Sequence, residues 1–310
     1  MTTNRRNFLK SIAALPLAAT AASGTLASGI GFTGSQFGHK LKLSLNVYSF
    51  NSLLRSGTID LFDVLDFCAE HGFDAIDPTG YYFPGYPNVP SDEYIRRFQR
   101  KAFLLGLDIS GTGIRNDFVN PDASSRAADI DMTRDWIAAA AKLGSPNIRI
   151  FPGKSAHDGY SRDQVFDWMA RDIATCCEIG KQHGVMIALQ NHNDFLMTAA
   201  DVERIFEMVD SDWLGLNLDI GSFRQHDPYE EIQKSLKYAI TWQLKENVWI
   251  DGKETPTDFD KLLRIIKDSG YRGYLPIETL GAGDPYEKIP ALLNRVRNGI
   301  ANAEHMEVAP

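Results

Sequence analysis

The feature that most constrains the fold is a regular alternation of short apolar strands with longer amphipathic helices, which begins at Leu41. Apolar residues recur at spacings of three and four in the predicted helices, and several of these end at a glycine. The predicted strands span residues 41–50, 73–79, 107–113, 147–153, 185–192, 213–221, 238–247 and 274–281. The predicted helices span residues 59–72, 91–106, 129–144, 161–184, 198–210, 228–237, 257–270 and 284–300. This order predicts an α/β protein with a parallel sheet.

Eight strand–helix units predict a single (β/α)8 TIM barrel that spans residues 41–302. The alternative is a doubly wound open sheet, which would carry a glycine-rich phosphate-binding turn after an early strand. The sequence Gly-Thr-Gly at residues 111–113 is too short a match to that turn. No linker or internal repeat divides the sequence, so we expect one domain.

Composition and charge exclude one class of protein. Of the 310 residues, 44% are hydrophobic and 23% are charged, as in an ordinary globular protein with a large core. The formal net charge is −8 and the basic residues are scattered, whereas proteins that bind nucleic acid present clustered lysine and arginine to the phosphates. We therefore expect no nucleic-acid partner. We expect Cys68, Cys176 and Cys177 to be free thiols, because the adjacent pair would form a disulfide only with strain.

Residues 1–30 differ in kind from the rest of the chain. Arg5 and Arg6 are paired and precede an alanine-rich apolar run from Ser11 to Ala27. This pattern resembles a twin-arginine export signal. We expect residues 1–30 to form the signal peptide and a mature N-terminal extension, and the protein to be periplasmic, without membrane contact after cleavage. A disordered basic tail or a short membrane anchor is the alternative.

Polar side chains stand at the ends of the later predicted strands. They are Arg149, Gln190, His192, Asp219, Gln243, Lys245 and Glu278. In a (β/α)8 barrel the carboxyl ends of all strands meet at one mouth, where the active sites of such enzymes lie. A buried polar group costs free energy unless it has a partner. We therefore expect these side chains to form a functional site.

The sequence from Leu41 to about Ile300 resembles the sugar phosphate isomerase/epimerase family, the xylose isomerase-like TIM barrels. The resemblance implies that strands five to eight end in Glu, Asp, His and Glu, which bind a divalent metal. The matching positions here are Gln190 in ALQNH, Asp219 in LNLDIG, Gln243 in TWQLKE and Glu278 in LPIETLG. The resemblance thus implies a carbohydrate-acting isomerase whose metal ligands are these four residues.

Two of the four ligand types depart from the family pattern. Glutamine at positions 190 and 243 keeps an oxygen that can bind a hard cation, but it has no negative charge. A further histidine that many members carry three residues beyond the strand-six aspartate is Ser222 here. We therefore expect manganese or magnesium to be bound weakly or to be absent. His192 shares the strand face of Gln190, so it is either a substitute ligand or a base.

The departure also restricts the mechanism. The family's epimerases use carboxylates on strands five and eight as a proton-transfer pair beside a carbonyl, and Gln190 cannot accept that proton. A reaction with a single base remains open, with His192 or Glu278 as the base and Lys245 or the metal stabilising the enolate. The products would be those of isomerisation, elimination or hydration, the last two as in a 3-keto-sugar lyase or hydratase.

The predicted ligand is a small-molecule carbohydrate. Arg149, Asn191, Tyr82 and Trp249 are the candidate substrate-binding residues, since they lie at or just beyond the strand ends. The alternative from another class is a catalytically silent sugar-binding barrel. A barrel nuclease would need a histidine-rich zinc site and a basic groove, and the sequence has neither.

Overall fold

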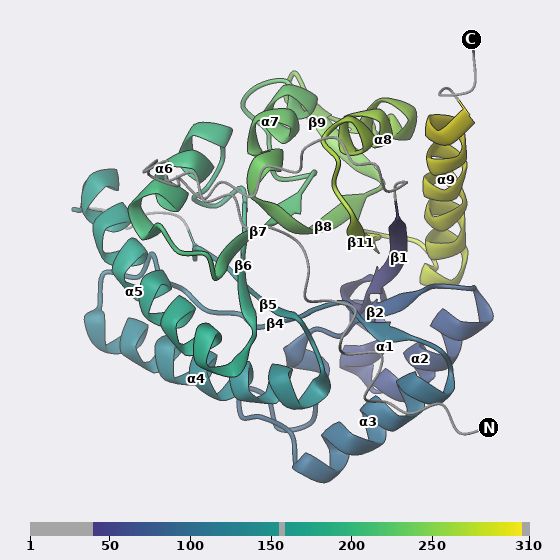
Figure 1. Cartoon of the computed structure of the whole chain (residues 1–310), viewed down its shortest axis with the longest axis horizontal. Coiled ribbons are helices and arrows are strands. Elements are labelled where there is room, and N and C mark those ends of the chain that lie inside the picture. Colours follow the sequence, from purple (N-terminus) through teal and green to yellow (C-terminus); the bar gives the residue numbers. More distant parts are fainter. Residues whose placement is uncertain (1–39, 155–158, 306–310) are drawn as a thin grey trace, which may run out of the picture.

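The computed structural model describes residues 40–154 and 159–305, and it is a barrel of parallel strands surrounded by helices (Figure 1). The barrel strands are β1 (Leu41–Asn46), β2 (Ala75–Asp77), β3 (Asp108–Ile109), β4 (Thr112–Gly113), β5 (Asn147–Ile150), β6 (Met186–Gln190), β7 (Leu214–Asp219), β8 (Ala239–Lys245) and β11 (Gly273–Glu278). The predicted (β/α)8 barrel is confirmed. The export signal predicted for residues 1–30 lies outside the described residues.

The barrel closes through its third strand, which is interrupted. The sheet order is β3-β2-β1-β11-β8-β7-β6-β5-β4, so both ends of the order belong to the segment from Asp108 to Gly113. Ser110 and Gly111 separate the two short pieces. A Cβ atom on Gly111 would lie only 2.9 Å from Oδ1 of Asn147, so the close approach of the next strand requires glycine there. The single strand predicted at residues 107–113 is thus present in two parts.

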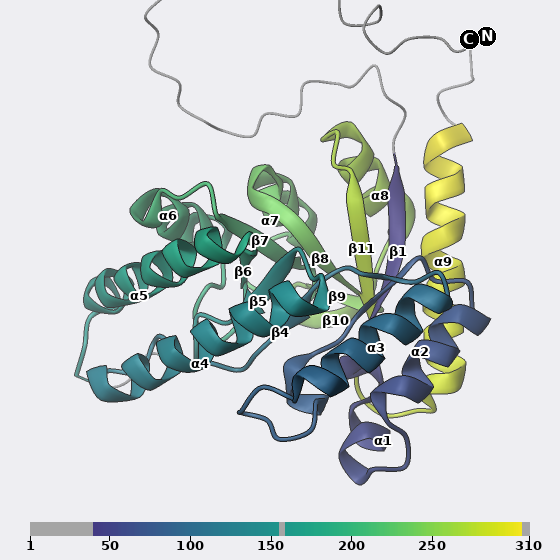
Figure 2. The same ribbon diagram turned by 60° about the horizontal axis from the view of Figure 1, so that its bottom comes forward.

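Helices cover the outside of the barrel, as the two views show (Figure 1, Figure 2). They are α1 (Asn51–Ser56), α2 (Leu61–Glu70), α3 (Asp92–Leu104), α4 (Ala123–Leu143), α5 (Arg162–His183), α6 (Ala199–Val209), α7 (Pro228–Ser235), α8 (Phe259–Asp268) and α9 (Pro285–His305). Polar caps fix where they begin. Ser161 accepts from the backbone N–H of Gln164 at the start of α5, and Thr198 does the same for Asp201 in α6.

The first predicted strand was wrong at its end, and a hairpin that was not predicted follows another strand. The first strand stops at Asn46 and not at Phe50, because the Asn46 side chain accepts from the backbone N–H of Tyr48 and starts a 3-10 turn. An antiparallel hairpin of β9 (Asn247–Ile250) and β10 (Lys253–Pro256) follows β8. Its two-residue turn is Asp251-Gly252, with φ angles of 50° and 72°. An Asp-Gly pair is typical of a tight hairpin turn.

The inside of the barrel is polar and its outside is apolar. Along β7, Leu216 and Leu218 belong to the apolar core between the strands and the helices, whereas Asn217 and Asp219 alternate with them. Below the mouth, the hydroxyls of Ser44 and Ser110 are 2.6 Å apart. The strands therefore deliver polar groups to the interior and the upper end of the barrel. None of the described helices has the length and apolar character needed to cross a membrane.

Candidate active site at the barrel mouth

The parallel register places the late strand ends beside one another. Asp219 of β7 pairs with Gln243 of β8, and Lys245 of β8 pairs with Glu278 of β11. Residues two apart on a strand face the same way, so Gln243 and Lys245 both point into the mouth. Gln190 ends the neighbouring strand β6. We call Gln190, Asp219, Gln243, Lys245 and Glu278 the late-strand cluster, and these residues lie together at the strand ends, while their roles stay predictions.

Asp219 is the centre of the late-strand cluster and is fully buried. Its Oδ2 accepts from Nε2 of Gln190 at 2.7 Å and from Nζ of Lys245 at 2.8 Å, and its Oδ1 accepts from the backbone N–H of Gly221 at 2.9 Å. Burial alone would raise the pKa of Asp219, but the charge and hydrogen bond of Lys245 outweigh it and the pKa is lowered. Asp219 is therefore a fixed anion.

Asn191 holds the backbone of Asp219 in place. Its Nδ2 donates to the Asp219 carbonyl at 2.9 Å, and its Oδ1 accepts from the Asp219 N–H at 2.8 Å. The side chain is fully buried. Because both of its polar groups are used in this way, Asn191 positions Asp219, and its contact with substrate stays a prediction.

Lys245 bridges the two carboxylates of the cluster. Its Nζ lies 2.8 Å from Oδ2 of Asp219 and 3.2 Å from Oε2 of Glu278. The two carboxylates raise the pKa of Lys245 against the effect of its burial, so it is a cation. Burial raises the pKa of Glu278, and the negative charge of Asp219 adds to this. The cluster thus has one strongly held carboxylate and one with greater affinity for a proton.

The donor set of the late-strand cluster does not fit a resident divalent cation. Hard cations need several oxygen lone pairs turned toward one point. Here the Gln190 amide N–H donates to both Asp219 and Oε1 of Gln243, each at 2.7 Å, and the Lys245 ammonium lies between the carboxylates. Residues 40–154 and 159–305 also hold no group of three or more His, Cys, Asp or Glu that could bind a metal. Whether a metal binds weakly or not at all stays a prediction.

A second group of polar residues lies on the early strands. Arg149 of β5 is buried, and its Nη2 donates to the hydroxyl of Tyr81 at 3.1 Å. Asp77 ends β2, where Nδ2 of Asn46 donates to its Oδ2 at 2.8 Å. A Cβ on Gly113 would lie 2.6 Å from Nε of Arg149, so glycine there makes room for the guanidinium. We call Asp77, Tyr81 and Arg149 the early-strand cluster.

The two clusters influence each other electrostatically. Burial raises the pKa of Asp77 to about 6, although Arg149 and the Asn46 hydrogen bond act in the opposite direction. The charge of Glu278 also acts on Asp77 and on Arg149. Glu278, which contacts Lys245, is therefore coupled electrostatically to both clusters.

Several buried atoms of the mouth have no hydrogen-bond partner within the described part of the chain. They are Nε and Nη1 of Arg149, Oε1 of Gln190 and Nδ1 of His192. Buried polar groups are nearly always paired in native proteins, with protein, water or a ligand. Donors on one side of the mouth and an acceptor on the other suit a ligand that carries several hydroxyl or carbonyl oxygens.

His192 follows β6 and is partly exposed. Its ring lies edge-on to Phe151, with centroids 5.2 Å apart. Its Nδ1 is 2.8 Å from Oδ2 of Asp194, but without good hydrogen-bond geometry. Burial lowers the pKa of His192, although Asp219 and Asp194 act against this. The neutral ring can therefore accept a proton near neutral pH.

The two predicted aromatic contacts lie at the rim. The Tyr82 hydroxyl donates to Oδ1 of Asn51 at 2.8 Å. Trp249 is on β9, with the guanidinium of Arg224 4.4 Å above its ring, and Nε of Arg224 donates to the Gly221 carbonyl at 3.4 Å. Trp249 thus stands beside the loop that follows β7.

Sequence reasoning missed Asp77 and Tyr81. Asp77 lies near the end of the strand predicted at residues 73–79, so the strand-end rule that selected Arg149 applies to it equally. Tyr81 was not among the candidate substrate-binding residues, whereas its neighbour Tyr82 was. The distinction between the two tyrosines depends on the turn at residues 80–82, a 3-10 helix that the sequence does not predict.

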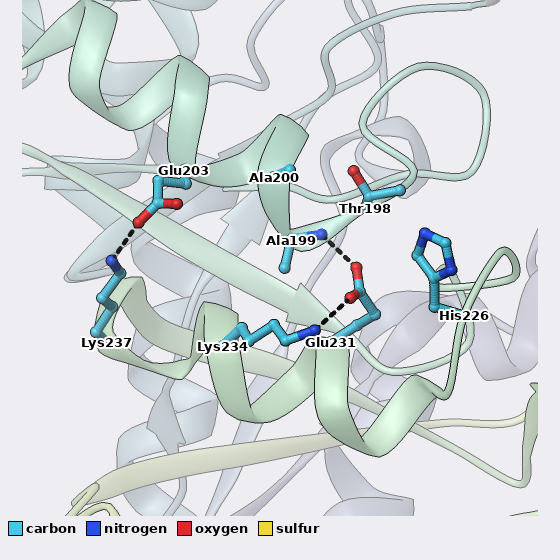
Figure 3. Close-up of a pocket in the computed structure, with 8 residues that line it drawn as sticks. All are labelled: Thr198, Ala199, Ala200, Glu203, His226, Glu231, Lys234 and Lys237. Atoms are coloured by element: carbon cyan, nitrogen blue, oxygen red, sulfur yellow. Dashed lines mark hydrogen bonds and ion pairs between the residues drawn. The ribbon is translucent and has the colours of Figure 1, made fainter.

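A separate pocket of about 460 Å³ lies outside the barrel between α6 and α7 (Figure 3). Its charged groups are paired with one another. Oε2 of Glu231 accepts from the backbone N–H of Ala199 at 2.5 Å, and Lys237 pairs with Glu203 at 2.6 Å. These contacts join two helices, and we assign the pocket no chemistry.

Comparisons with known proteins give the same architecture. The profile described as xylose isomerase-like TIM barrel matches residues 65–298. Among solved structures, 3-keto-D-glucoside 4-epimerase from E. coli has 14% identity and a TM-score of 0.67, over 84% of this chain and 100% of that one. D-psicose 3-epimerase from Clostridium cellulolyticum H10 has 16% identity and a TM-score of 0.70, over 84% and 99%. The probable 3-DHS dehydratase from Bacillus anthracis has 19% identity and a TM-score of 0.66, over 82% and 98%. No curated protein sequence matches the chain.

Proposed function

Since the chain belongs to the xylose isomerase-like TIM barrel family, we propose that it is an enzyme that removes the proton beside the carbonyl of a small keto-sugar. The proposal rests on buried atoms of Arg149 and Gln190 that have no partner among the described residues and lie at a mouth containing Lys245 and Glu278. A sugar supplies both hydroxyl donors and oxygen acceptors to such atoms. The structural neighbours named for 3-keto-D-glucoside, D-psicose and 3-DHS suggest the same class of reaction.

The charges of the mouth favour a neutral sugar. Asp77, Asp219 and Glu278 supply three carboxylates, whereas Arg149 and Lys245 supply two cations, so the ionised site carries one net negative charge. A phosphate would meet unfavourable electrostatics in it. We therefore propose an unphosphorylated sugar or glycoside as the substrate.

Glu278 is the proposed base. Asp219 accepts from three donors, and one of these, Lys245, also contacts Glu278. The pKa of Glu278 is raised, so Glu278 is the better proton acceptor of the two. In the proposed step the C–H bond beside the carbonyl breaks, the proton moves to Glu278 and the electron pair shifts to the carbonyl oxygen. Lys245 stabilises the resulting enolate. Return of the proton to the neighbouring carbon of the enolate gives isomerisation, and loss of a leaving group gives elimination.

Solvent exchange tests the proposal without knowledge of the product. Keto-sugars, including 3-keto-glucosides, D-psicose and D-tagatose, are incubated with the protein in D₂O, and deuterium beside the carbonyl is measured by NMR. We expect incorporation with at least one sugar and a loss of about 10²- to 10⁴-fold in Glu278→Gln, the usual contribution of a general base. Glu246→Gln is the matched control, since Glu246 pairs with Lys288 and the Leu280 N–H instead.

The remaining alternatives give different results in the same experiment. If His192→Gln loses exchange and Glu278→Gln keeps it, the base is His192, as in the lyase or hydratase alternative. If a sugar binds and the wild-type protein exchanges no proton, the chain is the silent sugar-binding barrel and the proposed function is wrong.

We also propose that the protein is exported through its twin-arginine-type N-terminus. The support is the sequence alone, with Arg5 and Arg6 before the apolar run. Cell fractionation should find the wild-type protein in the periplasm, and replacement of both arginines by lysine should retain it in the cytoplasm.

A further inference from the structure

Residues at the ends of the neighbouring strands fix the position of Lys245. Its Nζ contacts one oxygen from each of Asp219 and Glu278, at 2.8 and 3.2 Å. A Cβ at Gly221 would lie 2.8 Å from Cδ of Lys245, so the glycine after β7 leaves room for the lysine side chain to pass. The ammonium is thus held at the point where the two acidic strand ends meet.

The two glutamines complete this arrangement. Nε2 of Gln190 donates to Asp219 and to Oε1 of Gln243, both at 2.7 Å. Oδ2 of Asp219 therefore receives two donors, an amide N–H and an ammonium. A divalent cation at the same place would face the Lys245 charge, and the amide of Gln190 would have to turn away from Asp219.

We infer that Lys245 is the resident cation of this site and that the protein needs no divalent metal. This inference deepens the proposed function, on which it rests for its chemical meaning, because it assigns the positive charge near the reacting carbonyl to the chain itself. Arg149 of β5 is a buried cation elsewhere in the mouth, where its Nη2 donates to the Tyr81 hydroxyl.

The test is the binding of Mn²⁺ alone, without sugar. Wild-type protein treated with EDTA is titrated with MnCl₂ by calorimetry, and its metal content is measured after dialysis. We expect no stoichiometric manganese at micromolar concentrations. We expect Lys245→Met to bind Mn²⁺ at least tenfold more tightly than wild type, because two neighbouring carboxylates then lack their cation. Lys237→Met, which removes an exposed partner of Glu203, is the matched control and should resemble wild type.

One manganese per wild-type chain at micromolar concentration overturns the inference, whatever the variants do. If Lys245→Met is poorly folded by circular dichroism, Lys245→Arg retains the charge and should exclude Mn²⁺ as the wild type does. Binding by this variant also counts against the inference. The result is separate from the proposed function, since a protein that exchanges no sugar proton can still bind or exclude manganese.

Discussion

The two sides of the barrel mouth are built in opposite ways. In the late-strand cluster, Asp219 is satisfied by an amide, an ammonium and a backbone N–H. In the early-strand cluster, Arg149 has one side-chain hydrogen bond, to Tyr81, and two buried nitrogens without a partner in the described residues. The charged groups of the late-strand cluster are thus paired with one another, and only Oε1 of Gln190 lacks a partner among the described residues, whereas the early-strand cluster offers the donors of Arg149 to a ligand.

Within this single site, the late-strand cluster therefore has the contacts of a structural framework, and the early-strand cluster has those of a binding surface. Groups that are already hydrogen-bonded and charge-paired are preorganised, so they hold their geometry while a reaction proceeds. Unpartnered buried donors instead gain most from a ligand. The comparison therefore predicts that substitutions in the late-strand cluster affect stability as well as turnover, whereas substitutions of Arg149 and Tyr81 in the early-strand cluster affect substrate affinity.

The largest expected effect is on stability, from Asp219→Ala. Removal of this carboxylate leaves Lys245 with Glu278 alone and takes the acceptor from Gln190. Breaking a buried ion pair typically costs about 3 to 5 kcal/mol. We expect the free energy of unfolding to fall by about 3 kcal/mol, measured by chemical denaturation, because Lys245 keeps one partner.

Asp131→Ala is the control for that measurement. Asp131 pairs with Arg134 on an exposed face of α4, where its side chain is 71% exposed. Exposed pairs contribute about 1 kcal/mol at most. If Asp219→Ala is no more destabilising than Asp131→Ala, the late-strand cluster is not a structural framework.

Arg149→Met should act on affinity. A hydrogen bond from a charged donor is worth about 1.5 to 3 kcal/mol, so we expect KM for the sugar to rise about 10- to 100-fold while kcat changes much less. Steady-state kinetics with the sugar found by deuterium exchange measures both. Arg204→Met, at an exposed pair with Asp163, is the control. An equal loss in kcat with unchanged KM would place Arg149 in the chemistry and contradict the division between the two sides.

Asp77→Asn tests the early-strand cluster through pH. The pKa of Asp77 is about 6 in the folded chain, above its usual 3.8, with Arg149 and Glu278 as the charged groups that act on it. The folded state therefore holds this proton more tightly, and its contribution to stability is present below pH 3.8 and lost as the pH rises through 6.

We therefore expect Asp77→Asn to gain stability relative to wild type between pH 4 and pH 8. Each pKa unit corresponds to about 1.4 kcal/mol, and we expect a gain of about 1 to 2 kcal/mol, since partial exposure of Asp77 reduces the effect. Urea denaturation at several pH values measures it. A difference between the two proteins that is constant with pH would show that burial does not perturb this carboxylate.

The barrel could be predicted from sequence because its signals are local. Capping residues such as Ser161 and Thr198 mark helix starts, and apolar runs mark the strands. The interruption of the third strand was not predictable in the same way. It depends on the contact between Gly111 and Asn147, which belong to different strands.

The sequence predicted which residues of the candidate site lie at the strand ends, but it did not predict which of them hydrogen-bond to one another. The strand-end rule brought together Gln190, Asp219, Lys245 and Glu278 correctly. It could not show that Asn191 holds the Asp219 backbone, because Gln190 and Asn191 look equally available in the sequence. Hydrogen-bond direction decides between framework and ligand contact, and that direction arises only from tertiary structure.

The smallest expected effect distinguishes two adjacent tyrosines. Tyr81 accepts from Nη2 of Arg149, whereas the Tyr82 hydroxyl donates to Asn51. Tyr81→Phe removes a partner that orients the guanidinium, and one such hydrogen bond is worth about 0.5 to 1.5 kcal/mol. We expect KM to rise about 3- to 10-fold in Tyr81→Phe and to stay within about twofold in Tyr82→Phe, its matched control in the same kinetic assay. The reverse order would mean that the sugar contacts Tyr82, as the sequence first indicated, and that the early-strand cluster orients Arg149 without help from Tyr81.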